Sequence, residues 1–147
     1  MNITDKTIKK VLHHEATREK MWWFWTTSEG VKAFFCEASH IELTPFGAYE
    51  IYFSMDWPEG ERGSEGCKVL SYLPQKMLSF SWNAPPKFEK VRNHTYQTWV
   101  VLEMEENILT LTHLGWPEGQ EWNDVYDYFD KAWSYVFEQL KGAILNG

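Results

Sequence analysis

The chain has 147 residues, of which 14 are Lys or Arg and 21 are Asp or Glu, so its formal net charge is −7. This length fits a single domain, residues 1–147, and an apolar fraction of 44% can supply a sizeable core without disulfides or metals. The acidic balance argues against a nucleic-acid partner and against docking on anionic lipid, and no stretch approaches the roughly 18 apolar residues of a membrane span.

The N-terminal part of the sequence predicts one strand followed by two short helices. Residues 3–15 have the composition of a strand, although their alternation is only partial. Thr17 is a candidate N-cap for a short helix over residues 18–25. Ser28 is the next candidate cap, and the helix that it begins runs to residue 34 or 35.

The middle of the chain is a series of strand-length segments that turn signals separate. These segments are residues 36–43, 48–55, 64–72, 77–82, 95–104 and 107–114. The segment 77–82 alternates strictly, so Leu78, Phe80 and Trp82 share one face of their strand. The connections are short, which favours antiparallel hairpins over crossover connections.

The last segment, residues 123–145, has the periodicity of a long amphipathic helix. Its apolar stripe comprises Val125, Phe129, Ala132, Trp133, Val136, Leu140 and Ile144. The order of elements predicts an α+β protein in which a curved antiparallel sheet of six to seven strands grips this helix, with the two short helices inserted near the start. The concave face of such a sheet and the helix enclose a space.

Five local motifs occur in the order of one known superfamily. Residues 16–26 are similar to its opening pattern Ala-Pro-x-x-x-Val-Trp-x-x-x-Thr, with Thr17 in place of Pro. The other four are Phe34 in place of Trp, Gly66-Cys67-Lys68-Val69 followed by residues 74–82, residues 107–115, and Ala132-Trp133 in place of Gly-Trp.

With the order of elements, these motifs resemble the START and birch-pollen-allergen (SRPBCC) superfamily, whose domain is the helix-grip fold. Within it the sequence is most similar to the family named for the activator of the heat-shock protein 90 ATPase. The superfamily includes lipid carriers, cyclases and co-chaperones, so the resemblance implies a fold and a list of candidate functions rather than one activity.

Aromatic residues are unusually frequent, with 9 Trp, 7 Tyr and 9 Phe. Such residues fill a thick core or line a cavity. If they line the space under the helix, the candidate cavity residues are Phe80, Trp82, Trp99 or Val100, Leu111, His113, Phe129 and Trp133. His113 shares a strand face with Leu111, so it either orients a ligand or is a core histidine whose hydrogen bonds are satisfied.

A four-residue sequence, Trp-Pro-Glu-Gly, occurs twice, starting at Trp57 and at Trp116. Each copy follows a predicted strand, and Pro second with Gly fourth suits a type I turn. Turn chemistry does not explain the two Trp residues. One hypothesis places Trp57 and Trp116 at the cavity mouth, and the alternative makes them exposed turn residues or an oligomer contact.

The sequence contains no recognisable metal or catalytic motif. His13-His14-Glu15 lacks the second His of a metalloprotease helix, and Cys36 is far from Cys67 in the sequence. We therefore expect no metal, no cofactor, no catalytic residues and two free thiols in a cytoplasmic protein, since no apolar signal region precedes residue 10.

Three functional hypotheses remain from the sequence. The main one is non-catalytic binding of a small apolar or amphipathic molecule between the sheet and the last helix. The second, which the family resemblance implies, is a co-chaperone-like protein interaction, with a chaperone or homodimer contact through the exposed sheet face or the Trp-rich loops. The third is a cyclase or hydrolase that uses His113 in the cavity.

Overall fold

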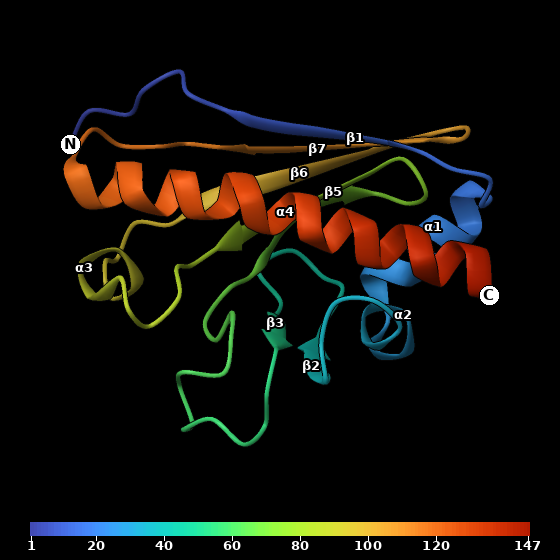
Figure 1. Ribbon diagram of the computed structural model, residues 1–147, viewed down its shortest axis with the longest axis horizontal. Helices are drawn as coiled ribbons and strands as arrows, with labels where there is room; N and C mark the ends of the chain where they lie inside the picture. The colour runs from blue at the N-terminus through green and yellow to red at the C-terminus, as the bar shows by residue number, and fades with distance from the viewer.

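The computed structural model describes residues 1–147 and has the predicted α+β architecture, with seven strands and four helices. Figure 1 shows one long helix lying across a sheet, with the short helices at its two ends. The elements in chain order are β1 (Ile8–His13), α1 (Arg18–Thr26), α2 (Ser28–Lys32), β2 (Ala38–Ile41), β3 (Tyr49–Tyr52), β4 (Val69–Leu73), β5 (Met77–Trp82), α3 (Glu89–Arg92), β6 (Thr98–Glu105), β7 (Ile108–Leu114) and α4 (Gln120–Asn146).

All strand pairs are antiparallel, as the short connections predict. Five strands form one sheet in the order β1-β7-β6-β5-β4, and β2 and β3 form a separate hairpin. Isolated bridges from Ala48 to Lys68 and from Tyr52 to Gly63 connect the hairpin to the segment before β4. The predicted strand over 64–72 is therefore a strand only from Val69 onward.

Helix α4 buries a stripe of large side chains at helical spacing. Val125, Phe129, Trp133 and Leu140 are buried as predicted, and Phe137 joins them. Ala132, Val136 and Ile144 lie at the border of the stripe and are half-buried. The helix begins at Gln120, three residues before the predicted start. No helix of the chain is long and apolar enough to cross a membrane.

Threonine side chains begin the two N-terminal helices. The hydroxyl of Thr17 accepts a hydrogen bond of 3.0 Å from the Lys20 amide, which confirms the predicted cap of α1. Thr27, and not the predicted Ser28, caps α2 by accepting from the Gly30 amide at 2.9 Å. Gly30 lies against the carbonyl oxygen of Trp23, where a Cβ atom would collide, so this glycine permits the close packing of α1 on α2.

The inner face of the sheet carries alternating buried residues that meet α4. Leu78, Phe80 and Trp82 of β5 share this face, as predicted, and are buried. On β7 the alternation buries Leu109, Leu111 and His113. At the end of the sheet near Trp82, this core leaves an apolar cavity against α4.

Candidate ligand-binding cavity

An apolar cavity of about 330 Å³ lies between α4, the end of β5, the residues after α2 and the loop that joins β3 to β4. This volume is within the range of small-molecule sites. Eighteen residues form its wall, and 12 of them are hydrophobic. In Figure 1 the β3–β4 loop and α3 both lie on the side of α4 away from β1 and β7. These segments bring side chains from four parts of the sequence to one place.

The inner wall is a cluster of three aromatic rings, Phe35, Trp82 and Trp133. The ring centroids of Trp82 and Trp133 are 5.4 Å apart. Phe35 lies 5.8 Å from Trp82 and 5.9 Å from Trp133. All three residues are buried. The cluster presents rigid apolar surfaces to the cavity, since packing on every other side fixes the rings.

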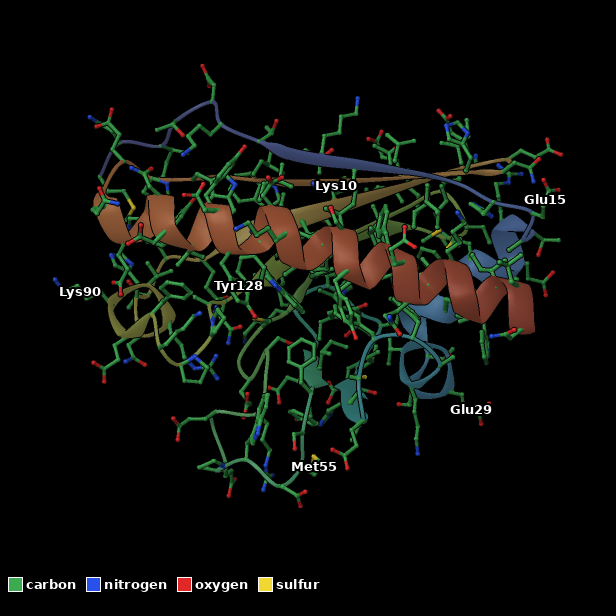
Figure 2. The ribbon with its side chains drawn as sticks, viewed as in Figure 1. Lys10, Glu15, Glu29, Met55, Lys90 and Tyr128 are labelled. Atoms are coloured by element: carbon green, nitrogen blue, oxygen red, sulfur yellow. The ribbon has the colours of Figure 1, made fainter.

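The mouth of the cavity is formed by exposed aromatic residues. Phe53 and Trp57 come from the β3–β4 loop, and Tyr128 and Tyr135 come from α4. Trp57 is 49% exposed and Tyr135 is 66% exposed. Figure 2 shows Tyr128 at the edge of α4 that faces α3 and this loop. A ligand that entered the cavity would cover apolar surface that is now in contact with water.

His113 lies behind the inner wall and does not line the cavity. Its Nδ1 accepts a hydrogen bond of 3.0 Å from the indole Nε1 of Trp133. Its Nε2 lies 2.7 Å from the hydroxyl of Thr98. Because Nδ1 accepts, the proton of the neutral ring is on Nε2, and Thr98 in turn donates to the carbonyl oxygen of Trp82 at 3.4 Å. Burial lowers the pKa of His113 to about 3, so the ring is neutral near pH 7.

The two Trp-Pro-Glu-Gly turns have different environments. Trp57 is in the wall of the cavity at its mouth. Trp116 is 1% exposed, and its Nε1 donates a hydrogen bond of 3.0 Å to the carbonyl oxygen of His113. The structure therefore places Trp116 in the core and away from the mouth, because the turn after β7 folds back over its own strand.

The other sequence-predicted cavity residues are divided between the wall and the core. Trp82, Phe129 and Trp133 are in the wall. Phe80, Val100 and Leu111 are fully buried in the core and do not reach the cavity. Trp99 points to the opposite face of β6 and is half-buried, where its ring occupies the space that a Cβ of Gly115 would need.

Several wall residues were not predicted from the sequence. They are Phe34, Phe35, Phe53, Glu61, Gly63, the segment from Asn83 to Pro86, Arg92, Tyr128, Ala132, Tyr135 and Val136. The sequence provides a partial indication for Phe34, because it occupies a motif position. It also provides one for the aromatic residues as a group, because they are unusually frequent. Nothing in the local pattern around residues 53–63 indicates that this loop reaches α4.

Arg92 fixes the β3–β4 loop to the rest of the wall. Its guanidinium group donates to the carbonyl oxygens of Gly60 at 2.6 Å and Gly63 at 3.1 Å, and to that of Ala84. It also forms an ion pair of 3.3 Å with Glu65, and both side chains are largely buried. This arginine lies on the short helix α3, which the sequence pattern does not predict.

The Glu65 carboxylate organises the same loop. It accepts hydrogen bonds from the backbone amides of Arg62 at 2.9 Å and Gly63 at 2.7 Å. Burial acts to raise the pKa of Glu65, but the backbone N–H groups and the charge of Arg92 outweigh it, so this pKa is below its usual value. The carboxylate is therefore ionised near pH 7 and keeps the loop attached.

The described side chains offer no evident metal site. No three His, Cys, Asp or Glu side chains lie close enough together to hold a metal ion. At the end of β1, Nδ1 of His14 accepts a hydrogen bond of 3.1 Å from the Ala16 amide. Cys36 and Cys67 are both free.

A sequence profile matches residues 15–144, and its description is "Activator of Hsp90 ATPase homolog 1-like protein". No curated protein sequence matches the chain at a significant level. Among solved structures, a protein of Mesorhizobium loti is 18% identical, with a TM-score of 0.70 over 96% of this chain and 98% of that one.

Two further solved structures have the same fold. The Aha1 dimer from Colwellia psychrerythraea is 21% identical, with a TM-score of 0.63 over 95% of this chain and 96% of that one. A protein of Arthrobacter aurescens is 14% identical, with a TM-score of 0.70 over 99% of this chain and 92% of that one. At these identities the likeness concerns the fold alone.

Proposed function

Because the chain belongs to the Activator of Hsp90 ATPase homolog 1-like family, whose fold encloses a space under its long helix, we propose that it binds a small apolar or amphipathic molecule in the cavity beside Trp82 and Trp133. The binding is non-catalytic. The observation that carries this proposal is the cavity itself: a chain with 25 aromatic residues leaves about 330 Å³ unfilled at one end of its core.

Apolar burial would supply most of the affinity. A ligand that removes apolar surface from water gains about 25 cal/mol for each Å² buried, and rigid walls reduce the entropy lost on binding. The hydrogen bonds of Trp133 to His113 and of Thr98 to Trp82 hold the inner wall in one arrangement. His113 therefore supports the wall and is not the group that orients the ligand.

A neutral apolar dye tests the proposal. N-phenyl-1-naphthylamine should bind at one saturable site, gain fluorescence and quench Trp emission, since Trp82 and Trp133 are in the wall. Ala132→Leu adds a larger side chain to the wall and should weaken dye binding at least tenfold. Ser134→Leu places the same side chain on the exposed face of α4 and serves as the control.

Two outcomes would contradict the proposal. One is the absence of saturable dye binding to the folded wild-type protein. The other is an equal loss of affinity in Ala132→Leu and Ser134→Leu, because binding would then occur somewhere other than the cavity. Circular dichroism of both variants establishes that they are folded before the titrations are compared.

A protein interaction is the second candidate, and the exposed aromatic residues at the mouth favour it. Phe53, Trp57 and Tyr135 form an apolar surface that a protein partner would cover. The family description and the dimeric relative suggest a chaperone or a second copy of the chain as that partner. Sedimentation of the protein alone and with Hsp90, compared with Trp57→Ser, tests both partners. A cyclase or hydrolase based on His113 has less support, because this ring does not contact the cavity.

A further inference from the structure

One carboxylate in the wall of the cavity has no partner. Glu61 belongs to the β3–β4 loop, where its amide donates a hydrogen bond of 3.0 Å to the carbonyl oxygen of Pro58. Glu61 is one of the wall residues, is exposed to solvent, and its side chain forms neither a hydrogen bond nor an ion pair in the protein. The cavity therefore has an unpaired, hydrated carboxylate at its loop side.

The positive charge in the wall is already neutralised. Arg92 is the wall's only cationic side chain, and its guanidinium group is engaged by three backbone carbonyl oxygens and by Glu65. A ligand carboxylate or phosphate that approached the two terminal nitrogens of Arg92 would have to displace these partners. The wall therefore disfavours an anionic head group and leaves Glu61 as its available charge.

The aromatic residues at the mouth add to the same preference. The faces of aromatic rings carry negative electrostatic potential and attract ammonium groups, most strongly when several rings surround the cation. One mouth ring already has such a neighbour, since Lys87 Nζ lies 5.1 Å from the centroid of Tyr128. The rings of Phe53, Trp57 and Tyr135 have no cation–π contact with a lysine or arginine of the protein. They belong to the same wall as Glu61.

From these observations we propose that the ligand is a cationic amphiphile. Its ammonium group lies between Glu61 and the aromatic residues of the mouth, and its apolar part packs against Phe35, Trp82 and Trp133. This inference rests on the proposed function and specifies its ligand class.

Three ligands with the same octyl chain test the inference: octyltrimethylammonium, octanol and nonanoate. Each is titrated as a competitor of N-phenyl-1-naphthylamine in buffer of physiological ionic strength, which screens the long-range effect of the net charge of −7. We expect octyltrimethylammonium to bind most tightly and nonanoate most weakly.

Charge-neutral variants then identify the residue responsible. Glu61→Gln should weaken the binding of octyltrimethylammonium by about fivefold, as for a partly exposed ion pair, and leave octanol unchanged. Glu59→Gln is the matched control, since Glu59 is exposed in the same turn but outside the wall, and it should change neither ligand.

The outcomes separate this inference from the proposed function. If the dye binds but nonanoate displaces it as well as octyltrimethylammonium does, the cationic ligand class is wrong while the cavity still binds ligands. Equal effects of Glu61→Gln and Glu59→Gln would likewise overturn the role of Glu61. If the dye does not bind the wild-type protein at all, the proposed function fails, and this inference fails with it.

Discussion

The indole Nε1 of Trp133 donates a hydrogen bond of 3.0 Å to Nδ1 of His113, and both residues are buried. This bond joins α4 to β7 at the inner wall of the cavity. It fixes the tautomer of the imidazole, so Nε2 carries the proton and faces the hydroxyl of Thr98. Through Thr98 the same chain of hydrogen bonds reaches the carbonyl of Trp82, the second Trp of the wall.

Replacing His113 by Leu should therefore destabilise the protein. The substitution leaves the indole N–H of Trp133 and the hydroxyl of Thr98 without their partner in the core, and an unsatisfied buried polar group costs about 1–3 kcal/mol. We expect a loss of about 2–4 kcal/mol in the free energy of unfolding, measured by urea denaturation. His13→Leu, at an exposed site on β1, should change it by less than about 0.5 kcal/mol. A similar small change in His113→Leu would mean that this network contributes little.

Stability should fall as the pH is lowered below the ordinary pKa of histidine. Burial disfavours the charged ring and lowers the folded-state pKa of His113 to about 3, whereas an ordinary histidine has a pKa of about 6.5. Between these values the unfolded chain binds a proton that the folded protein does not. The contribution of His113 is thus complete above about pH 6.5 and decreases by about 1.4 kcal/mol for each pH unit below it.

Urea denaturation at about pH 6 and about pH 5 measures this dependence. The pKa of His14 is also lowered by burial and acts in the same direction, so the comparison must be made with His113→Leu. Between these two pH values, the free energy of unfolding should change by about 1.4 kcal/mol less per pH unit in His113→Leu than in the wild type. Equal slopes in the two proteins would show that His113 is not the group responsible.

Arg92→Ala should release the β3–β4 loop and weaken dye binding. The substitution removes the donors to the carbonyls of Gly60, Gly63 and Ala84 and leaves the Glu65 carboxylate without its cation. Hydrogen exchange of the amides of residues 57–66 should become faster, because the loop opens more often. Lys90→Ala, at an exposed position on α3, is the control. Unchanged exchange in Arg92→Ala would show that the remaining contacts, such as those of Asn83 to the carbonyl oxygens of Gly63 and Glu65, are enough to hold the loop.

Both thiols should react slowly in the folded protein. Burial raises the pKa of Cys36 and of Cys67 to about 12, which keeps the reactive thiolate scarce near neutral pH. A disulfide-exchange reagent at about pH 8 should titrate two thiols quickly only after denaturation without a reductant. Titration of fewer than two thiols in the denatured chain would indicate oxidation.

The sequence predicted the fold well because the fold depends on periodic patterns. Alternation along β5 identified the inward face of Phe80 and Trp82, and the helical stripe identified Phe129 and Trp133. Periodicity states which face of an element is buried. It does not indicate how far a helix lies from a sheet at each point. The sequence alone therefore could not distinguish Phe80, which is in the core, from Trp82, which lines the cavity.

The rest of the cavity could not be predicted because it depends on loop positions. Phe53, Glu61 and Arg92 come together through contacts to backbone carbonyls, which leave no pattern in the side-chain sequence. The repeated turn makes the same point. Trp57 and Trp116 begin identical four-residue sequences, and only the tertiary environment makes one a mouth residue and the other a core residue.

The way in which Arg92 holds the β3–β4 loop has an evolutionary consequence. The guanidinium group contacts carbonyl oxygens of the loop, and every amino acid carries such an oxygen. Most side chains of the loop, including Trp57 and Glu61, are therefore free to vary without loss of this attachment. A lineage with this anchor can exchange the residues that meet a ligand while the scaffold stays constant, so ligand preference is able to diverge faster than the fold.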